Sequence, residues 1–131
     1  MRYVIALDTT LRLLADRPTL APGTSLVAPT LLRSELVAAL YAQTAAGRID
    51  RKESNARLDR FRALKPRLLG DRVLQSLSWD IAQQLGHTDT FRAEYLALTR
   101  LQADAFITLD DSYAATVAEV VPLAPYAALL A

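Results

Sequence analysis

The sequence predicts an α/β fold built around a parallel β-sheet. Two short apolar runs, Met1 to Asp8 and Ala105 to Asp110, each end in a carboxylate and are flanked by helical patterns, as buried parallel strands are. Strand-like and helix-like segments alternate along the chain, which favours βα units. With 131 residues, of which 52% are hydrophobic and 22% charged, the chain is expected to form one domain over residues 1–131 around one core.

Apolar spacing and capping residues place the expected elements in chain order. The first half predicts a strand over Met1 to Asp8, a short helix capped by Thr9 or Thr10, a strand over Ser25 to Ala28, a helix from Leu31 that ends before Gly47, and a helix capped by Asp50 and stopped by Lys65-Pro66. The second half predicts a helix over Asp71 to Gly86, a helix from Thr88-Asp89-Thr90 to about Gln102, a strand over Ala105 to Leu109, a short helix around Tyr113 to Val117, and a last strand at Val120-Val121.

Composition excludes several kinds of protein. The chain has no cysteine and a single histidine, His87, so neither a disulfide framework nor a thiolate or multi-histidine zinc site is possible. The formal net charge of +1 gives no overall attraction to nucleic acid. No apolar run is long enough to cross a bilayer or to form a signal peptide, so a cytoplasmic protein without membrane contact is expected.

Three carboxylates are candidates for a shared site. Asp8 and Asp110 follow predicted strands, and ligands of open α/β sheets bind outside the carboxyl ends of the strands. Glu35 stands on an otherwise apolar helix face, where an ionised carboxylate is costly unless it is paired or bound to metal. Each has a simpler explanation as well: Asp8 and Asp110 as helix caps, and Glu35 in a salt bridge to Arg33 or another arginine. Together they favour one acidic pocket suited to a divalent cation.

The middle third of the chain is locally basic. Its cations are Arg48, Arg51, Lys52, Arg57, Arg60, Arg62, Lys65 and Arg67. Such a cluster can hold RNA phosphates beside an acidic pocket. The alternative, favoured for most of these residues, is a solvated helix face with ion pairs to Glu53 and Asp59.

Four segments in order along the chain carry a resemblance to a known family. They are Val4-Ile-Ala-Leu-Asp8-Thr-Thr, the stretch from Leu26 through Glu35 to Leu40, Tyr95-Leu-Ala-Leu-Thr, and Phe106-Ile-Thr-Leu-Asp110. The ensemble resembles the VapC-type toxins of the PIN-domain ribonuclease family. The resemblance implies a three-layer α/β/α domain with a central parallel sheet, Mg²⁺ or Mn²⁺ bound by carboxylates, RNA cleavage, a homodimer, and a cognate VapB-type antitoxin. By motif position, Asp8, Glu35 and Asp110 would be the catalytic metal ligands, supported by the hydroxyls of Thr10 and Thr108.

One position departs from the family pattern. Where the family usually has an aspartate three residues before the tyrosine, this chain has Arg92. Asp89 lies near the same helical face and is a weak candidate to replace that acid, whereas Glu94 is expected to point elsewhere. A cation here should weaken metal binding, because ligand charge tunes affinity for hard cations. Two functions therefore stand: a metal-dependent endoribonuclease toxin, or a catalytically impaired PIN-fold protein that binds an antitoxin or RNA.

Overall fold

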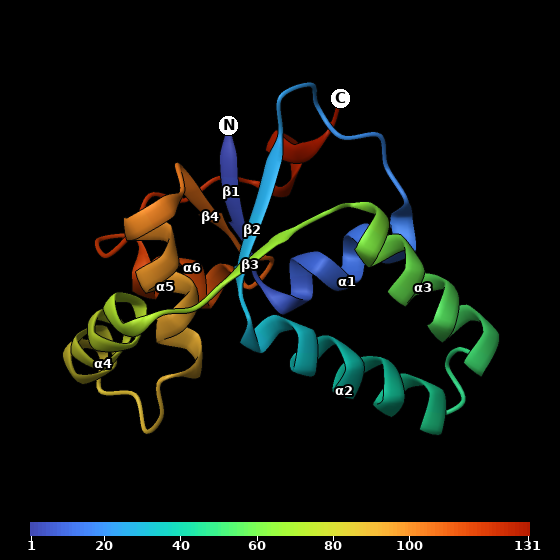
Figure 1. The fold of residues 1–131 in the computed structure, drawn as a ribbon, viewed down its shortest axis with the longest axis horizontal. Helices are drawn as coiled ribbons and strands as arrows, with labels where there is room; N and C mark the ends of the chain where they lie inside the picture. The colour runs from blue at the N-terminus through green and yellow to red at the C-terminus, as the bar shows by residue number, and fades with distance from the viewer.

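A four-stranded parallel sheet forms the centre of the molecule. The computed structural model covers residues 1–131, and its strands β1 (Arg2–Ile5), β2 (Ser25–Pro29), β3 (Arg67–Leu69) and β4 (Ala105–Ile107) lie in the order β3-β2-β1-β4. Strand β1 is central and pairs in parallel with both β2 and β4, with Ile5 opposite Ile107. The carboxyl ends of β1 and β4 therefore lie side by side, and Figure 1 shows that the sheet is flanked by helices.

Six α-helices and one 3₁₀ helix surround this sheet. They are α1 (Leu7–Asp16), α2 (Leu31–Ala45), α3 (Arg51–Ala63), α4 (Arg72–Leu85), α5 (Phe91–Gln102), α6 (Asp111–Val117) and η1 (Tyr126–Leu129). In Figure 1, α4, α5 and α6 gather on one side of the strands and α1, α2 and α3 on the other. The α/β class and the central parallel sheet are thus confirmed.

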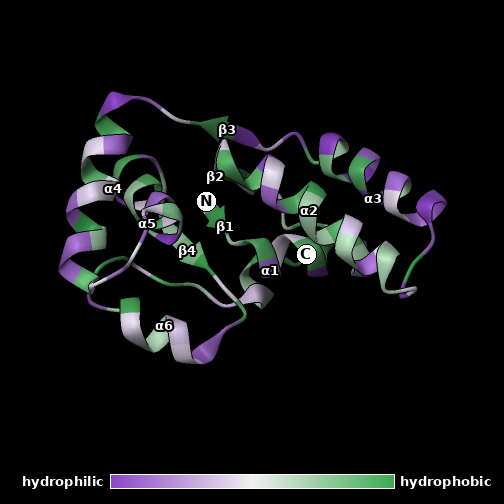
Figure 2. Cartoon of the chain, turned by 90° about the horizontal axis from the view of Figure 1, so that it is seen from below, coloured by the Kyte–Doolittle hydropathy of each residue, from purple (hydrophilic) through white to green (hydrophobic).

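The core divides into two clusters because side chains alternate across a strand. Val4 and Phe106 belong to the larger cluster, which also contains the buried residues of α5. Tyr3 and Ile5 belong to a smaller cluster that Leu129 of η1 completes. Figure 2 shows the strands as hydrophobic and the outer faces of α3 and α4 as more hydrophilic.

Aspartates cap three of the helices. Asp50 was predicted as a cap, Asp110 was considered as one, and Asp71 was predicted as the start of its helix. Asp50, Asp71 and Asp110 each accept a hydrogen bond from the backbone N–H three residues later. Such caps satisfy donors that the first helical turn leaves without partners. The predicted end of α4 is also confirmed, since Gly86 adopts the left-handed conformation at its C-terminus.

The structure differs from the prediction at two strands. Strand β3 was not predicted, because a three-residue, partly exposed edge strand has no periodic pattern. The last strand at Val120-Val121 is wrong: both backbone N–H groups bond to the carbonyl of Val117, in a turn that follows α6. The pairing with β4 falls two residues later, as an isolated bridge between Phe106 and Leu123.

The first helix begins earlier than predicted, at Leu7, with Ala6 rather than a threonine at its N-cap. Asp8 therefore lies in the first turn of α1 and not at the end of the strand. None of the helices combines the length and apolar character needed to cross a lipid bilayer.

Candidate functional site

The three predicted acids line one pocket at the carboxyl ends of the strands. Asp8 follows β1 on α1, Glu35 follows β2 on α2, and Asp110 follows β4 at the start of α6. Helix α5 contributes the opposite wall. The pocket has a volume of about 290 Å³ and is lined by Ala6, Leu7, Asp8, Glu35, Arg92, Tyr95, Phe106, Thr108, Asp110 and Tyr113.

Asp8 is held in place by donors on both carboxylate oxygens. Its Oδ1 accepts from the backbone N–H of Thr9 at 2.6 Å and lies 3.2 Å from the Thr9 hydroxyl, which has a shorter alternative acceptor in the carbonyl of Ile107. Its Oδ2 accepts from the Thr108 hydroxyl and from the backbone N–H of Leu109, both at 3.1 Å. The carboxylate thus ties α1 to the segment after β4, and three hydrogen bonds fix its orientation.

Thr9 is a site residue that the sequence analysis did not single out. Its side chain is fully buried, and its hydroxyl donates at 2.9 Å to the carbonyl of Ile107, the last residue of β4. Thr10, which the resemblance placed near the site, instead bonds to the carbonyl of Ala6 within its own helix and does not line the pocket. Of the two predicted supporting hydroxyls, the structure places Thr108 alone in the pocket.

Asp110 combines the two roles that the sequence left open. Its Oδ1 accepts a hydrogen bond of 2.9 Å from the backbone N–H of Tyr113 and so caps α6, while the residue also lines the pocket. The other oxygen, Oδ2, has no hydrogen-bond partner within the protein. One carboxylate can therefore hold the helix and still present an oxygen to a ligand.

Glu35 is neither in a salt bridge nor isolated. Its Oε1 accepts a hydrogen bond of 2.5 Å from the hydroxyl of Tyr95, a buried residue of α5. Burial, and next the hydrogen bond to Glu35, raise the pKa of Tyr95, so the tyrosine keeps its proton and acts as the donor. The predicted pairing with Arg33 or another arginine is wrong, because no arginine nitrogen lies within ion-pair distance of Glu35.

Arg92 lies in the pocket but pairs with none of its acids. Its guanidinium carbon lies 4.6 Å from the centre of the Tyr113 ring, a cation–π contact between α5 and α6. Burial raises the pKa of Tyr113, and the charge of Arg92 opposes that rise. No hydrogen bond or salt bridge joins Arg92 to another side chain, although Asp8, Glu35 and Asp110 line the same pocket.

Neither neighbouring acid of α5 replaces the acid missing at position 92. Asp89 accepts a hydrogen bond from the backbone N–H of Phe91, is exposed, and does not line the pocket. Glu94 also stays outside the pocket lining. Burial raises the pKa of Glu94, and the negative charge of Glu35 raises it further, so these two carboxylates lie close enough to interact. This interaction was not predicted, because Glu94 was expected to point elsewhere.

The donor set suits a hard divalent cation in type, but the acids do not converge. Carboxylate and hydroxyl oxygens are the ligands that Mg²⁺ and Mn²⁺ prefer, and free oxygens remain on Asp110 and Glu35. In the arrangement seen, however, no three acidic or histidine side chains come close enough together to share one ion. Binding an ion through all three acids would therefore require their side chains to move.

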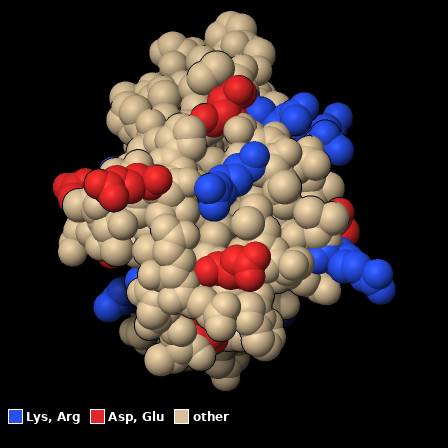
Figure 3. Space-filling model, turned by 90° about the vertical axis from the view of Figure 1, so that its left-hand side faces the viewer, with Lys and Arg blue, Asp and Glu red and all other residues tan.

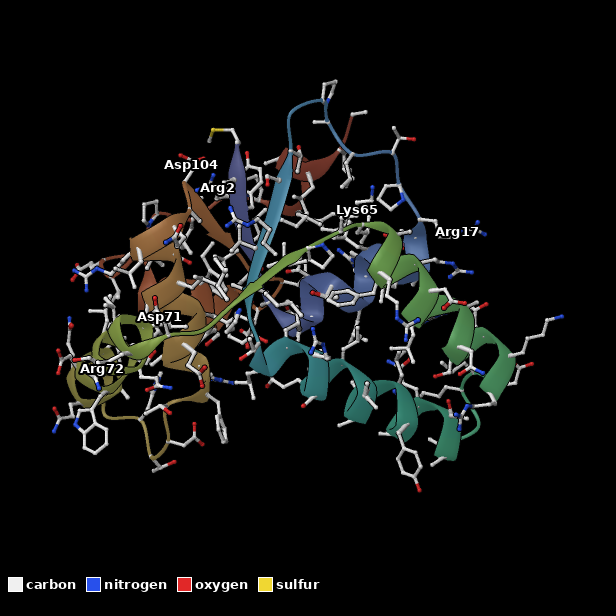
Figure 4. All side chains as sticks on the ribbon, viewed as in Figure 1. Arg2, Arg17, Lys65, Asp71, Arg72 and Asp104 are labelled. Atoms are coloured by element: carbon white, nitrogen blue, oxygen red, sulfur yellow. The ribbon has the colours of Figure 1, made fainter.

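Another hollow of the surface lies at the opposite end of the sheet. It has a volume of about 530 Å³ and lies at the amino ends of β1 and β4, where Arg2 and Asp104 form part of its lining. Figure 4 shows both residues at the end of the sheet opposite the start of α2. Within this hollow the backbone N–H of Arg2 bonds to Asp104 and the Arg2 side chain bonds to the Gln102 carbonyl. These polar groups already satisfy one another, which favours the smaller acidic pocket as the functional site.

Solved structures with the same arrangement of strands and helices come from toxin–antitoxin complexes. A chain of the VapBC2 complex from Rickettsia felis, crystallised with a DNA fragment from its promoter, superposes with a TM-score of 0.65 at 12% sequence identity, over 95% of this chain and 98% of that one. This chain has the fold of a VapC-type PIN domain. A chain of the VapBC-1 complex from nontypeable Haemophilus influenzae matches the same PIN fold with a TM-score of 0.59 at 15% identity, over 96% and 98% of the two chains. No protein-family model and no curated protein matches by sequence.

Proposed function

We propose that this protein is a metal-dependent endoribonuclease of the VapC toxin type, which a VapB-type antitoxin neutralises. The observation that carries the proposal is the meeting of Asp8, Glu35 and Asp110 in one pocket at the carboxyl ends of the sheet. The likeness in fold to chains of two VapBC complexes supports the same class. Homodimerisation is part of the proposal and follows from the same resemblance.

The three acids are the residues that would hold Mg²⁺ or Mn²⁺. A bound ion would supply a more acidic water as nucleophile and stabilise charge on the leaving oxygen of a phosphodiester. Hydrogen bonds within the protein orient two of these acids. The hydroxyl of Thr108 and the backbone N–H of Leu109 orient Asp8, and the hydroxyl of Tyr95 orients Glu35. Phe106 and Leu7 add apolar side chains to the lining of the pocket.

A catalytically impaired PIN-fold protein that binds an antitoxin or RNA is the second candidate. Two observations favour it. Arg92 brings a cation into the pocket, and no three acids converge. Loss of one acidic ligand should weaken metal binding and impair the positioning of the attacking water.

The basic middle of the chain contributes less to RNA binding than its composition suggests. Arg57 and Arg60 both pair with Glu53, and Arg62 pairs with Asp59, as the alternative interpretation predicted. Figure 3 shows the other side of the molecule, where α4 and α5 lie, and there too Lys and Arg side chains are scattered among uncharged and acidic ones. RNA contact is therefore proposed at the pocket.

The proposal is tested by measuring cleavage of a structured RNA in Mn²⁺, with EDTA as the control. Three proteins are compared: the natural chain, Asp8→Asn and Arg92→Asp. We expect Arg92→Asp to raise both Mn²⁺ affinity, measured by calorimetry, and the maximal cleavage rate. Cleavage by the natural chain that EDTA and Asp8→Asn abolish would support the nuclease. Cleavage by Arg92→Asp alone would establish the impaired form. If Mn²⁺ affinity and cleavage are the same in both proteins, position 92 does not belong to the site.

A further inference from the structure

We propose that Arg92 binds a phosphate group of single-stranded RNA in the pocket. This inference rests on the proposed function and assigns a role to one residue of the same site. Arg92 stands where the family pattern has an acid. A weaker metal site would explain the loss of that acid, but it would not explain why the arginine side chain lies in the pocket. Its guanidinium is exposed, lines the pocket, and is held over the ring of Tyr113.

The position of Arg92 is unfavourable by the usual rules of stability. It stands in the first turn of the 12-residue helix α5, where the helix dipole disfavours a cation. It forms no salt bridge that would offset this, even with three carboxylates lining the same pocket. The contact with Tyr113 offsets part of this cost, but it leaves the N–H donors of the guanidinium without a partner in the protein. An anionic ligand from outside the chain would supply that partner.

The contact with Tyr113 keeps the guanidinium ready for an anion. A guanidinium that lies over an aromatic ring leaves its N–H donors free at its edge, in a fork that matches two phosphate oxygens. The Tyr113 hydroxyl is buried and has no hydrogen-bond partner, so the ring face, and not the hydroxyl, positions Arg92. Tyr113 is in turn held by an edge-on contact with Phe106 of β4, which fixes the ring relative to the sheet.

Charge explains why an RNA phosphate needs this residue. The charged residues that line the pocket are Asp8, Glu35, Asp110 and Arg92, so Arg92 is its single cation. Three carboxylates repel a phosphodiester, and one arginine beside them supplies a point of attachment.

Binding of a fluorescent single-stranded RNA in EDTA tests this assignment without cleavage. We expect Arg92→Gln to lower affinity about tenfold, and to reduce the slope of log K against log salt by about 0.7, the value for one lost single-strand phosphate contact. Arg92→Lys should lie in between. Arg100→Gln is the matched control, because Arg100 is an exposed arginine of the same helix outside the pocket, and it should bind as the natural chain does.

Tyr113 gives a second test that separates positioning from general stability. Tyr113→Phe keeps the ring and should retain affinity and salt slope, whereas Tyr113→Leu should reduce both as Arg92→Gln does. If Tyr113→Leu lowers affinity but leaves the salt slope unchanged, the ring does not position Arg92.

The outcomes distinguish this inference from the proposed function. If the natural chain cleaves RNA with Mn²⁺ while Arg92→Gln binds RNA with unchanged affinity and slope, the assignment of Arg92 falls and the nuclease stands. If the natural chain neither binds nor cleaves RNA, both fall. If Arg92→Gln loses affinity for a polyglutamate peptide and not for RNA, the occupant is a carboxylate and the assignment to RNA is overturned.

Discussion

Asp8 shows how a residue can serve structure and chemistry at once. A carboxylate has about four acceptor positions, and donors of the protein occupy three of those of Asp8. Two of these donors are backbone N–H groups, of Thr9 and Leu109, which have no other partner in the fold. Replacing Asp8 therefore affects folding as well as the pocket.

We expect Asp8→Asn to destabilise the protein by about 1–3 kcal/mol, the cost of leaving part-buried donors unsatisfied, since an amide can accept on one side only. Urea unfolding at neutral pH measures the difference. Asp80→Asn, at an exposed position of α4 without a partner, is the control and should change stability by less than about 0.5 kcal/mol. Equal stability of the two variants would contradict the structural role of Asp8.

The acids of the pocket could be predicted from the sequence, but most of their partners could not. Asp8 and Asp110 follow apolar strands, a local pattern that the sequence displays. The hydrogen bond from Tyr95 to Glu35 joins residues 60 positions apart on α5 and α2, and it depends on where the sheet places these two helices, which no local pattern encodes. The contact of Arg92 with Tyr113 likewise joins two helices whose relative position only the folded sheet determines.

Helix ends were predicted better than strand ends because capping is local chemistry. Asp50, Asp71 and Asp110 each act on a backbone donor three residues away, within reach of sequence inspection. Strand β3 has three partly exposed residues and no pattern of its own, so it could not be predicted, whereas the apolar run of β4 predicts the strand but places its end two residues too late. Val120 and Val121 mimic a strand in composition, but α6 and the turn after it take up their backbone donors.

Helix α6 allows the cap and the site function of Asp110 to be separated. Asparagine caps helices about as well as aspartate, so we expect Asp110→Asn to keep the stability of the natural chain. It should nevertheless lose Mn²⁺ binding, because it lacks the charge. Asp110→Ala should lose about 1 kcal/mol of stability in addition. Urea unfolding and calorimetry with Mn²⁺ measure the two effects, and a stable Asp110→Asn that binds Mn²⁺ normally would exclude Asp110 as a ligand.

Helix α3 should make stability depend on pH through Glu53. The hydrogen bonds from Arg57 and Arg60 lower the pKa of Glu53 below its ordinary value of 4.5. Folding then favours the ionised form, so this contribution is complete above that ordinary value and disappears as the pH falls through the lowered pKa. Urea unfolding should show Glu53→Gln to be less stable than the natural chain at pH 7. At a pH below the lowered pKa of Glu53, the two proteins should be equally stable. A difference that persists unchanged in acid would contradict this account.

At the scale of the whole molecule, the proposed metal binding would be linked to folding. An ion that binds only the folded chain raises its stability by about 2.7 kcal/mol when its concentration is 100 times the Kd. We expect Mn²⁺ to raise the melting temperature of the natural chain slightly and that of Arg92→Asp more, with calorimetric scans in EDTA as the reference. No rise in either protein would argue against a divalent ion in this pocket.

The central place of β1 in the sheet has a consequence for synthesis. Strand β1 is synthesised first, but its second edge is paired only when β4 is made, about one hundred residues later. Asp8 receives the hydrogen bonds from Thr108 and Leu109 at the same late stage. On the ribosome, the three acids can come together only after Asp110 and Tyr113, whose backbone N–H bonds to the Asp110 carboxylate, have been synthesised. The pocket therefore cannot form on β1 and α1 alone, and it is completed only once β4 has joined the sheet.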